Sequence, residues 1–215
     1  MAEGTHGDPL RGECPLAEES FLLALERSTP VPGGGSAAAY AATVGLALLE
    51  KIVRLESERA HPAPEESNDW EALLGRVRRS AEILRRLRDE DSEAYVRLAE
   101  ARRSKDERAI QRAWEQAIAC PVEIMEAAHK ALFLAREAGE GCKGHLIADV
   151  LVVLQLLRAA CRGAYHIATA NLGMAARLPA WEGDLSRPAE ICSRAEKMFV
   201  AAEKAILGRI MHERP

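Results

Sequence analysis

The chain has 215 residues, of which 48% are hydrophobic and only 4% aromatic, so its core must consist mainly of aliphatic side chains. A formal net charge of -4, from 29 Lys and Arg against 33 Asp and Glu, provides no basic surface and argues against a nucleic-acid partner. We find no apolar run of about 18 to 20 residues, and residues 1–15 lack a signal-peptide core, so we expect no membrane partner and a cytoplasmic location. Five cysteines without a C-x-x-C pair predict reduced thiols and no metal site.

Apolar residues recur every three or four positions along most of the chain, which predicts an all-α fold. We expect a bundle of about six helices in one domain over residues 1–215, with residues 1–14 flexible. The expected helices span residues 15–27, 36–59, 68–103, 104–138, 146–178 and 186–212. The sequences N-D-W-E at Asn68 and S-K-D-E at Ser104 resemble capping boxes, and Pro121 is expected to kink the fourth helix.

Two of these helices are apolar on nearly every side. The sequences are AAAYAATVGLALL at residues 37–49 and IADVLVVLQLL at residues 147–157. Helices of this kind lie inside a bundle or at a subunit interface. Because one six-helix chain does not comfortably cover both, we expect a homodimer.

Three consecutive glycines, Gly33, Gly34 and Gly35, precede the first of these apolar helices. Glycine permits backbone conformations that are closed to other residues, and Ser36 is placed to cap the helix start. Such a start favours an anion or a closely approaching ligand. The alternative is a tight turn beside a crowded bundle, and the glycines alone favour that alternative.

Two rows of residues spaced by seven contain a polar exception. Asp91 interrupts the row formed by Val77, Leu84 and Leu98, and Asn171 interrupts the row formed by Val150, Leu157, Ala164 and Leu178. A carboxylate on an apolar face is costly unless it is paired or protonated, and functional sites often contain such groups. A structural anchor inside the bundle explains Asp91 equally well.

Asp149 and His145 are further candidates near the start of the fifth helix. Asp149 lies in the apolar sequence IADVLVV, where it also complements the helix dipole. His145 can titrate near neutral pH, although a single loop histidine is more often a surface residue.

The sequence P-x-P-G-G-G-S before an Ala-rich helix, followed by D-E-D-S-E-A-Y at residues 89–95, resembles the formiminotransferase-cyclodeaminase C-terminal family. The helix RAIQRAWEQAIACP at residues 108–121 is similar to a family helix that ends in a proline. Ala148-Asp149 and Asn171-Leu172 resemble the family's "SD" and "NL" signatures. The similarity extends from about residue 17 to residue 210.

The resemblance implies an all-α, dimeric enzyme that acts on the one-carbon unit of tetrahydrofolate without a metal or redox cofactor. The activity would be that of a methenyltetrahydrofolate cyclohydrolase or a formiminotetrahydrofolate cyclodeaminase. Asp91 and Asp149 would be catalytic acids or bases. The substrate would be bound by Asn171, His145 and the segment Gly33, Gly34, Gly35 and Ser36.

Two motifs depart from the family pattern. Arg54-Leu55-Glu56 replaces the usual Asn-Leu-Thr, and Cys142, Lys143, Gly144 and His145 replace a Gly-Asn loop. A folate-binding or regulatory homologue that has lost catalysis therefore stays open as an alternative. A purely structural helical oligomer is the third hypothesis.

Overall fold

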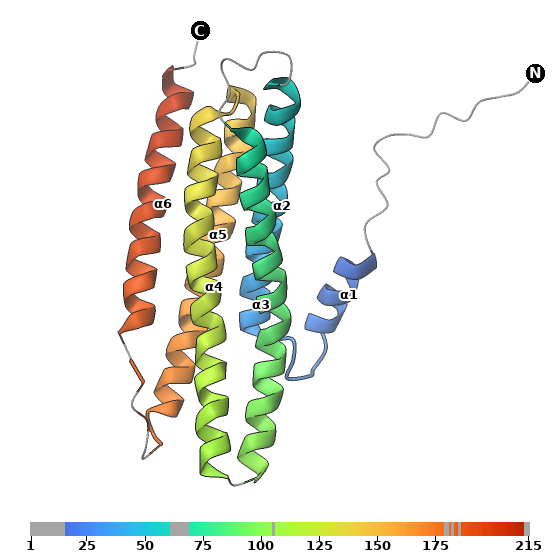
Figure 1. The fold of residues 1–215 in the computed structure, drawn as a ribbon, viewed down its shortest axis with the longest axis vertical. Helices are drawn as coiled ribbons and strands as arrows, with labels where there is room; N and C mark the ends of the chain where they lie inside the picture. The colour runs from blue at the N-terminus through green and yellow to red at the C-terminus, as the bar shows by residue number, and fades with distance from the viewer. Residues whose placement is uncertain are drawn as a thin grey trace, which may run out of the picture.

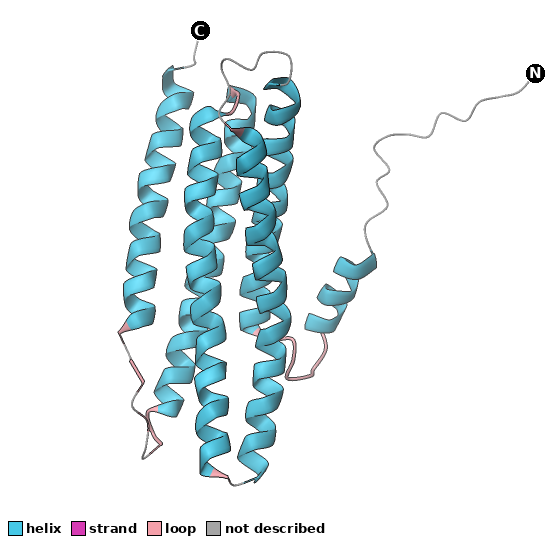
Figure 2. Cartoon of the chain, viewed as in Figure 1, coloured by secondary structure: helices cyan, strands magenta, loops and turns pink. Residues whose placement is uncertain are grey.

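The structure is a computed structural model that describes residues 16–60, 69–104, 106–178, 181, 183–184 and 186–212. The expected flexible segment, residues 1–14, lies outside these ranges. The described residues contain helices and loops but no strand, which confirms the all-α prediction (Figure 2).

The part of the chain that the structure describes forms six α-helices. They are α1 (Leu16–Leu25), α2 (Gly34–Ala60), α3 (Trp70–Ser104), α4 (Glu107–Gly141), α5 (Ile147–Ala175) and α6 (Arg187–His212), with a 3₁₀ turn, η2 (Gly144–Leu146), before α5. Helices α2 to α6 form a bundle in which consecutive helices run in opposite directions, and α1 lies beside the end where α2 begins (Figure 1). The ring of Phe21 on α1 packs against Tyr40 on α2, with centroids 4.7 Å apart.

Aspartates cap two of the long helices, at positions that differ from the expected ones. The Asp69 carboxylate accepts a hydrogen bond from Ala72 N at 2.9 Å, so Asp69 caps α3, which begins at Trp70. The predicted cap, Asn68, lies outside the described residues. Asp106 accepts hydrogen bonds from Arg108 N and Ala109 N at the start of α4. The predicted cap at Ser104 is wrong, because that residue ends α3 instead.

Helices α2 and α5 supply much of the core, as their apolar sequences indicate. Leu46 and Leu49 on α2, and Leu154 and Leu157 on α5, have no exposed surface. An added Cβ at Gly45 would lie 3.3 Å from Leu156 Cβ, so the glycine lets the two helices pack closely.

Both helices are also long and apolar enough to span a membrane. The sequence had instead led us to expect no apolar run of sufficient length. Their apolar 18-residue windows have mean hydropathies of 1.4 and 1.6, and 56% and 44% of these windows are buried inside the bundle. Core helices satisfy the same criterion, and one or two such helices are weak evidence for a span. Val44 on α2 and Val152 on α5 keep 42% and 49% of their surface exposed, so part of this apolar surface is left without a partner in the single chain.

Candidate functional site

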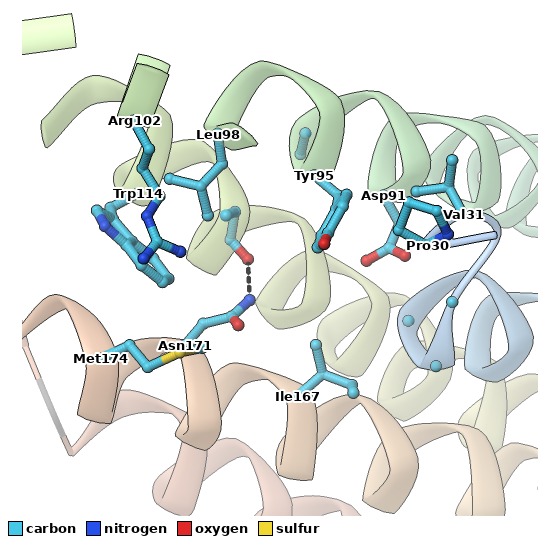
Figure 3. Close-up of a pocket in the computed structure, with 15 residues that line it drawn as sticks. Pro30, Val31, Asp91, Tyr95, Leu98, Arg102, Trp114, Ile167, Asn171 and Met174 are labelled. Carbon is cyan, nitrogen blue, oxygen red and sulfur yellow. Dashed lines mark hydrogen bonds between the residues drawn. The ribbon is translucent and has the colours of Figure 1, made fainter. Parts of the chain in front are cut away.

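A pocket of about 400 Å³ lies where α2 begins, between the main core and a smaller cluster that includes Leu98 and Trp114. Its walls come from the segment before α2, the second half of α3, the first turns of α4 and the last turns of α5. Figure 3 shows Asp91 at one end of the pocket, beside Pro30 and Val31. The pocket therefore brings together four segments of the sequence.

The three glycines line this pocket, but their backbone geometry differs from the prediction. None has a positive φ, so the expectation of a conformation closed to other residues is wrong. The requirement is for space. A Cβ at Gly35 would lie 2.0 Å from Asp91 Oδ1, and one at Gly34 would lie 2.9 Å from Ile167 Cδ1, whereas Gly33 has room for a methyl group. Gly35 thus allows the carboxylate of α3 to lie directly against the first turn of α2.

Ser36 is fully buried and connects α2 to α3. Its N–H donates to Asp91 Oδ2 at 2.8 Å, and its hydroxyl lies 3.0 Å from the same oxygen and 2.9 Å from Arg88 O. The prediction that Ser36 caps its own helix is therefore wrong, because α2 already begins at Gly34. Asp91 satisfies an N–H group of the first turn of α2 instead, and its negative charge faces the positive end of that helix.

The environment of Asp91 suits a group that both takes up and releases a proton. Burial raises the pKa of this carboxyl above its ordinary value, and the hydrogen bonds from Ser36 only partly oppose that rise. Asp91 is also the only carboxylate among the described residues that line the pocket. A raised pKa brings a carboxyl closer to the range in which general acid and base catalysis is efficient.

Asn171 on α5 lines the same pocket, toward the end with Met174 and Trp114 (Figure 3), and a proline on α4 explains its orientation. Pro121 lies inside α4 and has no N–H, so the carbonyl of Ala117, four residues earlier, lacks its normal helical donor. Asn171 Nδ2 donates to that carbonyl at 2.7 Å, as Figure 3 shows. Because the amide nitrogen must face the carbonyl, its oxygen is left to accept a hydrogen bond from a ligand.

The remaining pocket wall is largely apolar and aromatic. It includes Tyr95, Leu98, Trp114, Ile167 and Met174. None of these residues was predicted to belong to the site, although Tyr95 and Leu98 follow Asp91 at helical spacings of four and seven. A flat, mostly apolar ligand with a few polar atoms fits such a wall.

Asp149 and His145 do not reach this pocket within one chain. Asp149 lies in the first turn of α5, 22 residues before Asn171, which corresponds to about 33 Å along the helix. The exposed His145 lies in η2, with Nε2 3.1 Å from Arg59 Nη2. The structure therefore separates the predicted site residues into two groups.

The two motifs that depart from the family pattern contact each other at the end of the bundle where Asp149 lies. Glu56 is 5% exposed and accepts hydrogen bonds from Arg59 Nη1 at 2.9 Å and Lys143 N at 3.1 Å. Arg54 pairs with Glu50 at 2.8 Å. The hydrogen bond from Lys143 N to Glu56 holds the loop before α5 against the end of α2.

Within the described ranges, no group of three or more His, Cys, Asp or Glu side chains is placed to hold a metal ion.

An antiparallel helical bundle with a half-buried carboxylate in a largely apolar pocket is an architecture suited to binding a small molecule. The model of the formiminotransferase-cyclodeaminase family matches residues 18–176, from α1 to the end of α5. The chain belongs to that family.

The fold is also similar to that of solved structures. One is the crystal structure of formiminotetrahydrofolate cyclodeaminase from Thermotoga maritima, which matches with a TM-score of 0.75 and 19% sequence identity. The match covers 92% of this chain and 98% of that one. The comparison with curated proteins finds no match.

Proposed function

We propose that this protein is an enzyme that acts on the one-carbon unit at N5 and N10 of tetrahydrofolate, and that its reaction is the cyclisation of 5-formiminotetrahydrofolate with loss of ammonia. The observation that carries the proposal is the position of Asp91, a carboxyl with a raised pKa in a pocket whose other described lining residues are mostly glycine, apolar and aromatic, with Asn171 and Arg102 as the polar exceptions. Membership of the formiminotransferase-cyclodeaminase family and the likeness to a formiminotetrahydrofolate cyclodeaminase support this choice of substrate.

The reaction needs one proton to move between two nitrogen atoms. N10 attacks the carbon of the protonated formimino group, which forms the second C–N bond and leaves a proton on N10. Asp91 accepts this proton and gives it to the exocyclic nitrogen, so the C–N bond to that nitrogen breaks and ammonia leaves. The product is the 5,10-methenyl cation, and Asp91 returns to its starting state. No oxidation occurs, so the step requires no redox cofactor.

The other pocket residues bind and orient the substrate. The N–H groups of Gly34 and Gly35 have no acceptor among the described residues, as is usual in the first turn of a helix. They are suited to donate hydrogen bonds to a carbonyl oxygen of the pteridine. The amide oxygen of Asn171 accepts a hydrogen bond from an N–H of the ring. Within one chain, Asp149 and His145 lie too far from this pocket to contribute to the step.

The same carboxylate can act as the base for water addition to a methenyl bridge, which is the cyclohydrolase reaction. Absorbance measurements with purified protein distinguish the possibilities. We expect 5-formiminotetrahydrofolate to yield the absorbance of the methenyl product together with one equivalent of ammonia. If methenyltetrahydrofolate supplied as the substrate loses its absorbance, and the formimino compound does not react, the activity is that of a cyclohydrolase instead. Folate binding without turnover of either compound would favour the regulatory homologue.

A further inference from the structure

A second cavity of about 350 Å³ adjoins the pocket at the end far from Asp91. We call it the outer cavity, and it is lined by Arg102, Ile110, Trp114, Met174, Arg177 and Leu178. Arg102, Trp114 and Met174 line both spaces. We propose that the outer cavity binds the carboxylates of the glutamate tail of folate. This inference rests on the proposed function and assigns the direction in which the substrate lies.

The charges of the outer cavity favour an anion. Among the described residues that line it, only two are charged, and both are arginines: Arg102 from the last turn of α3 and Arg177 from just beyond α5. Among the described residues, neither guanidinium makes a hydrogen bond or ion pair, whereas Arg54, Arg97 and Arg158 all pair with glutamates of this chain. The planar donor fork of arginine fits a carboxylate with two parallel hydrogen bonds.

The order of residues along α3 matches the order of chemical groups in folate. Asp91, Tyr95, Leu98 and Arg102 occupy one face of the helix, and the 11 steps from Asp91 to Arg102 span about 16 Å along the axis. Figure 3 shows Arg102, Trp114 and Met174 at the end of the pocket opposite Asp91. In folate, the aminobenzoyl ring follows N10 and the glutamate follows that ring. If N5 and N10 lie at Asp91, these two groups can therefore extend in that order toward Arg102.

The apolar part of the wall lies between the two charged ends. The aminobenzoyl ring packs against Tyr95, Leu98 and Trp114, and its glutamate then enters the outer cavity between the two arginines. An opposite orientation would place the glutamate carboxylates beside Asp91, where like charges repel and burial adds a desolvation cost. The charge distribution therefore specifies one direction of binding.

Calorimetric titration of the full chain with two probes tests this assignment. The probes are 5-formyltetrahydrofolate, which carries the glutamate, and tetrahydropterin, which lacks the aminobenzoyl glutamate. We expect Arg102→Gln and Arg177→Gln each to weaken binding of 5-formyltetrahydrofolate roughly five- to tenfold, as for an exposed but well-oriented ion pair. Binding of tetrahydropterin should not change.

Arg103→Gln is the matched control, because Arg103 is an exposed neighbour on the same turn of α3 that lines neither cavity. It should leave the affinity for both probes unchanged. Wild-type affinity for 5-formyltetrahydrofolate in both Arg102→Gln and Arg177→Gln would overturn the assignment. Equal weakening of both probes would also overturn it, because the arginines would then act on the fold, for example through the helix dipole.

The outcome separates this inference from the proposed reaction. Wild-type protein that binds 5-formyltetrahydrofolate through the arginines without turning over a formimino substrate would contradict the reaction and keep the tail site. Wild-type protein that binds neither probe would overturn both proposals.

Discussion

Replacing Gly35 with alanine tests whether the contact between α2 and Asp91 needs a residue without a side chain. The new Cβ would lie 2.0 Å from Asp91 Oδ1 and 2.5 Å from Cγ, so the carboxylate must retreat by more than about 1 Å to reach an ordinary contact. That movement breaks or lengthens the hydrogen bonds from Ser36 N and Oγ, which now measure 2.8 and 3.0 Å.

The two lost hydrogen bonds to a charged group set an upper limit of about 3 to 6 kcal/mol. Water in the pocket replaces part of this, and alanine gains up to about 1 kcal/mol over glycine in a helix. We therefore expect the free energy of unfolding to fall by about 2 to 3 kcal/mol, within the range for overpacked sites. The melting temperature would fall by about 5 to 10 °C.

Urea unfolding followed by circular dichroism measures this change. Gly33→Ala is the matched control, because its Cβ would meet only Pro30 O, at 3.7 Å, and its effect should stay within about 0.5 kcal/mol. The Asp91→Ala background should remove most of the cost of Gly35→Ala, because the clashing carboxylate is then gone. Equal stability of Gly35→Ala and Gly33→Ala, or an unchanged cost in the Asp91→Ala background, would refute this explanation.

Three further predictions concern Asn171, Asp91 and assembly. Asn171→Leu leaves the α4 carbonyl without a donor and should cost about 1 to 3 kcal/mol of unfolding free energy. Pro121→Ala restores an N–H to that carbonyl, so a double-mutant cycle by urea unfolding should show a smaller cost in that background, and an equal cost would contradict the coupling. Burial raises the folded-state pKa of Asp91 above its ordinary value of 3.8, so its contribution to stability is present below that pH and is lost as pH rises through the raised pKa. Between about pH 4 and pH 7, wild type should therefore lose stability relative to Asp91→Asn. A difference in unfolding free energy between the two proteins that does not depend on pH would argue against the raised pKa. For assembly, we expect wild type to sediment as a homodimer and Val152→Glu on α5 as a monomer, whereas Val200→Glu on α6, at a valine 53% exposed, should stay dimeric; a monomeric wild type would contradict the interface.

The sequence was sufficient to predict the helices and the rows that hold their polar exceptions. Val77 and Leu84 are fully buried, and Asp91, seven residues further on, faces the pocket. Helical periodicity fixes such rows because it depends only on local geometry. The cap predicted at Ser104 lies at Asp106 instead, because several adjacent polar residues compete for the same free N–H groups.

The contacts between helices could not be predicted in this way. Serine is a residue type that often caps the N-terminus of a helix, yet the N–H and hydroxyl of Ser36 bind Asp91, 55 residues further along the chain. Asn171 depends in the same way on Pro121, a residue of another helix. Asp149 and Asn171 share α5 and similar motif signals, but the length of that helix separates them.

The most direct test of the central claim is the turnover of 5-formiminotetrahydrofolate by wild type and Asp91→Asn, measured per folded molecule through the methenyl absorbance. Asp89→Asn makes the same chemical change at an exposed aspartate two residues away that does not line the pocket, and it should keep wild-type turnover. We predict that Asp91→Asn lowers the rate by about 10²-fold or more while substrate binding survives, as expected for the loss of a general acid and base. An Asp91→Asn protein that is less stable but turns over substrate at the wild-type rate would show that Asp91 is a structural anchor and would contradict the proposed mechanism.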